Sequence, residues 1–388
     1  MAANTIAMYF KVDPGFLKSA DFSKQLEKIG LVCLGKVSGE PVTIDFSNNS
    51  EKLVVFQGSD KSHATARVYS DGLITVDIQH FVDDGGKEYT LADLQVRSCL
   101  AMGGQKAQLS EEYIRALEDK VRGLFGEKCQ EANSLYTPIR RGMRVWPYMV
   151  TADERLQELD YDKLVCEVDS KWQNIRIYHS IEHGNILYLD GDIMLGESDL
   201  IYTQTLCCIG KENYKGKSVL ILGGGDGGIL HELLKEGPDL VVMAEIDEEV
   251  IKACRTYMRG VCGSSMDNYE GPHHQIRIDD CIKVLHEYVS SGKKLDFVIN
   301  DLTEFPVDKA LKGYGYDFET TSLITELSLK ALKPDGKLLA RGNCLSAAEY
   351  RESFEKDIKT VGCEFKRKDV YVPSFHETYC LYEIWHGC

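Results

Sequence analysis

Hydrophobic and polar residues follow two different patterns along the chain, and the clearer one begins at residue 218. Short apolar runs with little alternation are separated there by segments whose apolar residues recur every three or four positions. Such runs indicate parallel strands buried on both faces, with helices between them. In order, the predicted strands are SVLILGG, LVVMAEID, HQIRIDDC, LDFVINDL and GKLLARGN. Residues 206–388 are therefore predicted to form a doubly wound α/β domain, to which EFKRKDVYVPSF and ETYCLYEIWH add an antiparallel strand pair.

The first 136 residues alternate apolar and polar positions instead. Two alternating runs flank the turn Ser-Asp-Gly within residues 64–81, which predicts a β-hairpin, and EKLVVFQG predicts another strand. Ser110 as a cap, glutamates after it and Gly126 at the far end predict a helix between them. The pattern predicts an α+β domain with an antiparallel sheet over residues 1–136. It carries no catalytic constellation, and we expect it to form a homodimer interface.

A polar, basic stretch at residues 137–147 is typical of a linker. Beyond it, residues 147–205 contain short strand-like runs with turn sequences His-Gly-Asn and Asp-Gly-Asp between them. This part is predicted to be a small β-hairpin module.

Length and composition restrict the cell compartment and the domain count. A chain of 388 residues, 43% hydrophobic and 27% charged, suggests two or three domains, and none of its apolar runs approaches the roughly 20 residues of a membrane span. The opening MAANTIAMYFKVDPG lacks the basic start of a signal peptide. The 13 cysteines show no disulfide-like spacing and the 10 histidines are scattered, which argues for the reducing cytoplasm and against a metal site.

The net charge is −16, from 45 basic and 61 acidic residues. A surface of this sign repels nucleic acid and favours the approach of a cation, although a well-solvated acidic surface is the more ordinary explanation. We therefore expect no nucleic-acid and no membrane partner.

Four acidic residues stand at four successive ends of the predicted parallel strands, where doubly wound sheets bind ligands. They are Asp226, Glu245, Asp280 and Asp301. Glu245 lies about 20 residues after the glycines, where an acid can bind ribose hydroxyls. Each acid alone could equally be a helix cap or a solvated turn residue. Together they predict a ligand site along this edge of the sheet.

Asp226 is an unusual residue for the glycine loop in VLILGGGDGGILHELL (residues 219–234). A loop between a strand and a helix usually presents backbone N–H groups to an anion. A carboxylate there repels a phosphate or an amino-acid carboxylate and favours an amine. In ordinary S-adenosylmethionine methyltransferases this loop faces the amino-acid tail of the nucleoside, which carries a carboxylate. The tail of decarboxylated S-adenosylmethionine is only an ammonium, so Asp226 favours that form.

The chain from about 147 to 387 resembles the polyamine aminopropyltransferases, which have a methyltransferase-like Rossmann sheet. The resemblance is carried, in order, by LGGGDGG, EID and the aspartate that ends the fourth strand. Within the family, DDC, NDLT and GNC are closer to the spermine synthases than to the spermidine synthases. A long N-terminal domain that resembles part of S-adenosylmethionine decarboxylase and forms the dimer is also expected of spermine synthases.

The resemblance implies roles for individual residues. The donor nucleoside should be bound by Gln173, Asp226, Glu245, Asp280 and Cys281. The acceptor amine should be bound by Tyr202, Asp226, Asp301, Phe375 and Glu377. Without the resemblance, Gln173, Tyr202 and Glu377 would pass for a solvated amide, a core tyrosine and a loop acid. Phe375 stands where the family pattern has tyrosine, and Glu304 lies near a second aspartate of spermidine synthases, so both bear on acceptor choice.

The implied reaction transfers the aminopropyl group of decarboxylated S-adenosylmethionine to spermidine, giving spermine and 5′-methylthioadenosine. Asp301 is the expected general base and Tyr202 its hydrogen-bonding partner. The donor is a co-substrate, and no cofactor is expected. A spermidine synthase acting on putrescine and a thermospermine synthase remain alternatives. A methyltransferase is disfavoured by Asp226, and a non-catalytic dimerisation scaffold by the four acids together.

Overall fold

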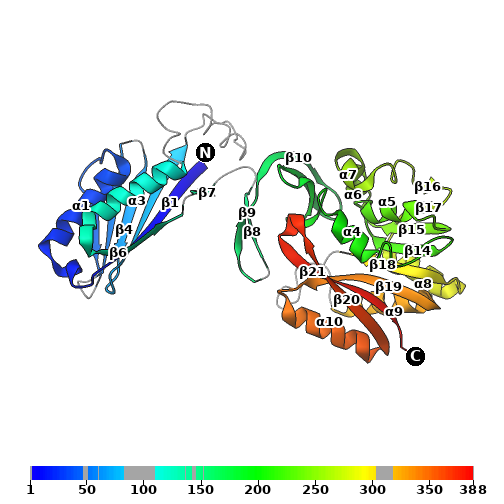
Figure 1. Ribbon diagram of the computed structural model, residues 1–388. Helices are drawn as coiled ribbons and strands as arrows, with labels where there is room; N and C mark the ends of the chain where they lie inside the picture. The colour runs from blue at the N-terminus through cyan, green and yellow to red at the C-terminus, as the bar shows by residue number, and fades with distance from the viewer. Residues whose placement is uncertain are drawn as a thin grey trace. The chain divides into compact units, whose positions relative to one another are not determined.

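The computed structural model describes residues 2–46, 51–59, 61–82, 110–135, 137–141, 146–151, 153–302 and 318–387. The chain divides into two compact units, Met1–Pro147 and Tyr148–Cys388 (Figure 1). Each unit is described by itself. No helix within these described ranges is long and apolar enough to cross a membrane.

In its described residues, the first unit is an antiparallel sheet packed against two helices. Its described strands run in the order β2-β3-β4-β5-β1-β6, and β7 also pairs with β1. The strands are β1 (Ala2–Val12), β2 (Val42–Asp45), β3 (Lys52–Gln57), β4 (His63–Val68), β5 (Leu73–Val82), β6 (Cys129–Ser134) and β7 (Ile139–Arg141). The helices are α1 (Ala20–Leu34) and α3 (Glu111–Phe125), with the short 3-10 turns η1 (Phe16–Lys18) and η3 (Gly126–Lys128).

The local signals read from the sequence of this unit are confirmed. β4 and β5 form the predicted hairpin, and β3 is the predicted strand before it. The hydroxyl of Ser110 accepts a hydrogen bond from the backbone N–H of Tyr113 at 3.2 Å, which caps α3 as expected. The helices cover the sheet through a core that includes Phe10, Phe22 and Phe56, all buried.

The second unit begins with two small antiparallel sheets. β8 (Tyr148–Val150) pairs with β9 (Leu156–Glu158). A four-stranded sheet follows in sequence order, with β10 (Tyr161–Asp169), β11 (Asn174–Ser180), β12 (Gly184–Leu189) and β13 (Asp192–Gly196). The turn between β12 and β13 has φ of 51° at Asp190 and 93° at Gly191, the left-handed backbone that a two-residue hairpin turn requires. The predicted β-hairpin module is thus present.

The rest of the second unit is one eight-stranded sheet with the order β16-β17-β15-β14-β18-β19-β21-β20. The strands are β14 (Ser218–Gly223), β15 (Leu240–Glu245), β16 (Glu270–Gly271), β17 (His274–Ile278), β18 (Leu295–Asp301), β19 (Leu332–Cys344), β20 (Cys363–Val372) and β21 (Glu377–His386). β17, β15, β14, β18 and β19 are parallel to one another, and β20 and β21 form the predicted antiparallel pair. The doubly wound α/β class is therefore confirmed.

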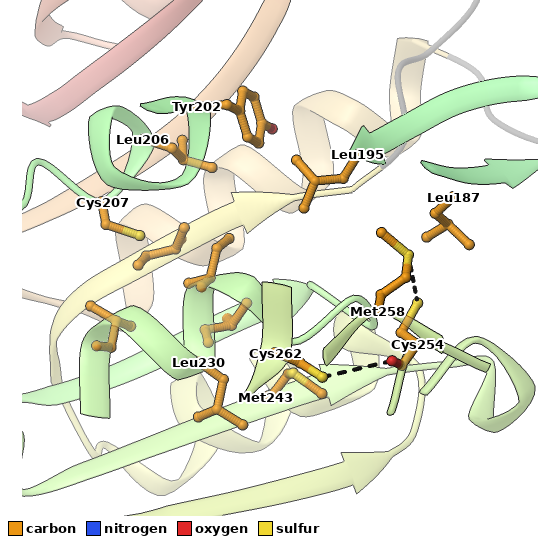
Figure 2. Close-up of a cluster of buried hydrophobic side chains, with 14 of the residues drawn as sticks. Leu187, Leu195, Tyr202, Leu206, Cys207, Leu230, Met243, Cys254, Met258 and Cys262 are labelled. Carbon is orange, nitrogen blue, oxygen red and sulfur yellow. Dashed lines mark hydrogen bonds between the residues drawn. The ribbon is translucent and has the colours of Figure 1, made fainter. Parts of the chain in front are cut away.

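Helices cover both faces of this sheet (Figure 1). They are α4 (Leu200–Leu206), α5 (Gly228–Lys235), α6 (Glu248–Tyr257), α7 (Arg259–Cys262), α8 (Cys281–Ser291), α9 (Phe318–Ala331) and α10 (Ala348–Thr360), with the 3-10 turn η5 (Pro373–Phe375). One buried cluster joins α4, α5 and α6 to the sheet and the β10–β13 module, and Figure 2 shows part of it. A second cluster joins the other face to α8, α9 and α10. The first cluster includes Tyr202, whose hydroxyl reaches Asp301 at the end of β18.

Candidate active site

The glycine loop joins β14 to α5 and is bent in a way that only glycine adopts easily. Gly223, Gly224 and Gly227 have φ between 77° and 79°. A Cβ at Gly227 would lie 2.7 Å from the Met266 side chain, so the loop packs too closely for a larger residue. The carboxylate of Asp226 accepts a hydrogen bond from the backbone N–H of Gly228 at 2.7 Å. The loop thereby holds the acid at the carboxyl end of the sheet, as the sequence predicted.

Asp301 ends the neighbouring strand and pairs with a tyrosine from α4. β14 and β18 are in register, with Gly223 beside Asp301. The Tyr202 hydroxyl, on a side chain only 2% exposed, donates a hydrogen bond to Oδ1 of Asp301 at 2.7 Å. Figure 2 shows Tyr202 at the edge of the buried cluster, with Leu206 beside it on the same helix. Core packing therefore fixes the tyrosine that orients the acid.

Burial gives these groups unusual proton affinities. It raises the pKa of Asp301 to about 7, with a further contribution from the negative charge of Asp226. The pKa of Asp226 is raised too, again chiefly by burial. Burial and the charge of Asp301 raise the pKa of Tyr202 well above its usual value, so this phenol is neutral at physiological pH and acts as a hydrogen-bond donor. A carboxyl group that titrates near pH 7 and lies at a strand end is suited to proton transfer.

Glu245 forms a second acidic position at the end of β15. Its carboxylate accepts hydrogen bonds from the backbone N–H groups of Gly225 at 3.1 Å and Asp247 at 2.9 Å. Burial nevertheless raises its pKa to about 7. The structure brings Gln173 to this strand end, where its amide donates to the Asp247 carboxylate at 3.0 Å. Glu245 and Gln173 thus bring a carboxylate and a side-chain amide to the same strand end.

Asp280 performs the capping role that was weighed as its alternative. Its carboxylate accepts a hydrogen bond from the backbone N–H of Ile282 at 2.8 Å and begins α8. Cys281 follows on the same helix, and burial raises its pKa to about 12, with the charges of Asp280 and Glu245 acting in the same direction. The charge of Glu245 therefore acts on Cys281, but this residue is a neutral thiol and not a nucleophile.

Phe375 and Glu377, the two remaining predicted site residues, follow β20 in the chain. Phe375 is buried, with its ring centroid 6.3 Å from that of Tyr202 and 4.9 Å from that of Tyr379. Glu377 lies at the start of β21 and accepts a hydrogen bond from the Ser346 hydroxyl at 3.2 Å. Phe375 thus belongs to the wall beside Tyr202, whereas Glu377 is held by a different loop. Glu304 lies outside the described residues.

The sequence reading missed three residues that support the site. Asp247 caps α6 through the backbone N–H of Glu249 and holds Gln173. Asp199 is 1% exposed and accepts hydrogen bonds from the backbone N–H groups of Gly196 and Ser374, which ties the start of α4 to the turn that carries Phe375. Arg341, on β19, is the third. The sequence signal for Arg341 is that it is a positively charged residue within the otherwise apolar strand LLARG.

Fold and site together define a class of protein: a doubly wound α/β protein with a glycine loop after β14 and buried acidic residues at the carboxyl ends of its parallel strands. Known families agree with this class. Residues 199–388 match the family described as the spermine/spermidine synthase domain, and residues 145–197 match the spermidine synthase tetramerisation domain.

Individual relatives carry related names. The polyamine aminopropyltransferase 1 of Hyperthermus butylicus is 32% identical over 220 residues, which cover 55% of this chain and 72% of that protein. The spermidine synthase of Schizosaccharomyces pombe is 30% identical over 149 residues, covering 38% of this chain and 48% of that one. The chain belongs to the spermine/spermidine synthase family, whose members are aminopropyltransferase enzymes.

Solved structures share the fold. The spermidine synthase from Thermotoga maritima superposes with a TM-score of 0.51 at 20% identity, over 62% of this chain and 78% of that one. A spermidine synthase in complex with the transition-state analogue AdoDATO gives a TM-score of 0.50 at 22% identity, over 62% and 80% of the two chains. At this level of identity the likeness concerns the fold alone.

Proposed function

We propose that this aminopropyltransferase transfers the aminopropyl group of decarboxylated S-adenosylmethionine to spermidine, giving spermine and 5′-methylthioadenosine. The observation that carries the proposal is the 2.7 Å hydrogen bond from Tyr202 to Asp301, in register with the loop that holds Asp226. This arrangement places a proton acceptor beside an anionic position for an ammonium. A proton acceptor is needed when the nucleophile is an amine. An anionic position suits a donor whose tail carries an ammonium and no carboxylate.

The donor is assigned to the strand ends of β14, β15 and β17. Asp226 attracts the ammonium of the aminopropyl group, and it would repel the carboxylate of intact S-adenosylmethionine. Glu245 is placed to accept hydrogen bonds from the ribose hydroxyls, with Gln173 beside it. Asp280 and Cys281, at the start of α8, complete the proposed nucleoside site.

The transfer is an in-line displacement. The lone pair of the acceptor nitrogen forms a bond to the aminopropyl carbon, the bond from that carbon to sulfur breaks, and its electron pair stays on sulfur. The nitrogen loses a proton, which Asp301 accepts while Tyr202 holds the carboxylate in place. General base catalysis contributes typically about 10²–10⁴-fold, and alignment of the two substrates must supply much of the remainder. Because the sulfonium is already an activated leaving group, the step uses the donor as a co-substrate and needs no cofactor.

Spermidine is favoured as the acceptor by sequence features and by charge. Its additional ammonium needs an anionic partner away from the reacting nitrogen, and Glu377 is our candidate. A charge-assisted contact of this kind is worth roughly 1.5–3 kcal/mol, or about a ten- to hundredfold preference over putrescine. The NDLT and GNC sequences and the long N-terminal unit point the same way.

A putrescine acceptor is the second candidate, because the relative from Schizosaccharomyces pombe is named a spermidine synthase. Phe375 adds to its case, since a buried phenyl ring donates no hydrogen bond to a longer polyamine.

One incubation separates the candidates. Purified protein is mixed with decarboxylated S-adenosylmethionine and either spermidine or putrescine, and the products are resolved by mass and retention time. We expect spermine from spermidine. Preferred use of putrescine would replace the proposed acceptor, thermospermine would change the attacking nitrogen, and no product from either amine would favour the scaffold alternative.

We also propose a cytoplasmic homodimer formed through residues 1–136. The described cysteines are free thiols, as a reducing compartment requires. The N-terminal unit has a core of its own, and the edge strand β2 exposes Val42 and Ile44 by 60% and 47%. The segment matched by the tetramerisation family, residues 145–197, is the competing place for an interface.

A further inference from the structure

Arg341 places a positive charge beside the proposed base. The parallel ladder of β18 and β19 pairs Asn300 with Ala340, so Asp301 and Arg341 occupy the next step of the same two strands. Side chains at one step of a parallel pair point to the same face, and neighbouring strands lie about 4.8 Å apart. Arg341 is half-buried, and its guanidinium carbon lies 5.7 Å from the centre of the Tyr379 ring on β21.

The charge of Arg341 acts on groups from three other elements. It lowers the pKa of Asp301 on β18 and of Asp226 in the glycine loop, against the burial that raises both. It also acts to lower the pKa of Tyr202 on α4, although burial prevails there. The negative charges of Asp226 and Glu245 act on Asp301 in the opposite sense. Arg341 therefore supplies positive charge to a cluster of carboxyl groups and a phenol.

We propose that Arg341 is a positioning residue that keeps the acceptor pocket short of protons, so that Asp301 is ionised and the attacking nitrogen is uncharged when transfer begins. The inference rests on the proposed role of Asp301 as the base. The acceptor amine and Asp301 together can carry two protons more than the reactive form, as an ammonium next to a carboxylic acid. That form has neither a nitrogen lone pair nor a proton acceptor. A fixed positive charge nearby disfavours it, because each added proton meets like charge.

The size of the effect follows from Coulomb's law. A unit charge about 6 Å from the titrating group shifts its pKa by about two units when the effective dielectric constant is about 20. Solvent reaching a half-buried site screens part of this interaction. We therefore expect loss of the Arg341 charge to move the titration of the bound complex upward by about one to two pH units.

The test is the pH dependence of kcat, which reports groups in the substrate complex. It is measured at saturating decarboxylated donor and acceptor for the unmodified enzyme, Arg341→Gln and Arg341→Lys. Arg341→Gln should lose about 10- to 100-fold of kcat near pH 7 and regain most of it above pH 9, because its acidic limb moves upward. Arg341→Lys keeps the charge and should keep the limb near its original place.

Lys337→Gln is the matched control, because it removes one positive charge from the same strand about 13 Å away. Its side chain pairs with Glu212 and Glu383 instead of the site, so its acidic limb should stay in place. Thermal unfolding checks each variant, and Arg341→Met replaces the glutamine variant if that one misfolds. An equal loss of kcat at every pH, or an equal shift in Arg341→Lys, would overturn the inference. Asp301→Asn in the same assay distinguishes failure of the proposed base from failure of the Arg341 proposal. Full turnover by Asp301→Asn would show that Asp301 is not the base. An inactive Asp301→Asn, together with an acidic limb that does not move in Arg341→Gln, would overturn only the role of Arg341.

Discussion

Replacing Asp301 by asparagine removes the proton-accepting group while keeping the shape of the side chain. The amide oxygen can still accept the hydrogen bond that Tyr202 donates, so the geometry of α4 against β18 is retained. What is lost is an oxygen basic enough to take a proton from an amine. Since burial raises the pKa of Asp301 to about 7, the unmodified group is partly ionised at neutral pH and becomes the effective base above it.

The expected loss of turnover in Asp301→Asn is about 10²–10⁴-fold, the usual contribution of a general base. The sign of the pH dependence follows from the same pKa. The ionised carboxylate is the active form, so kcat/KM of the unmodified enzyme, which reports groups in the free enzyme, should fall as pH drops below about 7 and level off above it. The variant has no titrating group at this position and should lose that limb together with its activity.

The assay follows the formation of 5′-methylthioadenosine between about pH 5 and pH 9, a window of about two units on either side of the pKa of Asp301. Asp296→Asn is the matched control, since Asp296 lies at the other end of the same strand and pairs with Lys217 and Lys333. Its pKa is lowered by those partners, so the control should lower thermal stability and leave the acidic limb in place. Near-normal turnover by Asp301→Asn, with donor still bound, would refute the assignment of the base.

Three further outcomes test other parts of the proposal. Asp226→Asn should narrow the preference for decarboxylated over intact S-adenosylmethionine in calorimetric titrations, and equal affinity in the unmodified protein would remove our explanation of Asp226. Glu377→Gln should lower kcat/KM for spermidine by about ten- to hundredfold and leave putrescine unchanged, and an equal effect on both amines would contradict a distal contact. A chain starting near residue 140 should be monomeric by light scattering, whereas a dimer would place the interface within residues 145–197 or beyond.

The acidic strand ends were predictable because topology alone brings them together. Parallel strands present their carboxyl ends at one edge, and apolar runs in the sequence marked where those strands stop. Whether an acid there points into the site or caps a helix depends on its side-chain rotamer, which sequence patterns do not encode. Asp280 took the cap of α8, while Asp301 turned toward Tyr202.

β1 shows a signal that the sequence reading passed over. Ile6, Met8, Phe10 and Val12 alternate with other residues and are all buried, the period-two pattern of a half-buried strand. Its partners, β5, β6 and β7, lie far from it in the sequence, and such pairings have no local signature.

The proposed site holds carboxyl groups whose ionised forms are disfavoured by burial, and this cost favours a cationic ligand. Asp226, Glu245 and Asp301 all have raised pKa values, so near neutral pH the site is short of the positive charge that would stabilise them as anions. Arg341 supplies part of that charge from a fixed position. An ammonium on the bound donor or acceptor would supply the rest, and the carboxyl groups would then ionise as substrate enters. In the proposed mechanism, proton transfer and substrate binding therefore depend on the same charges, because the bound cation would also stabilise the carboxylate that accepts its proton.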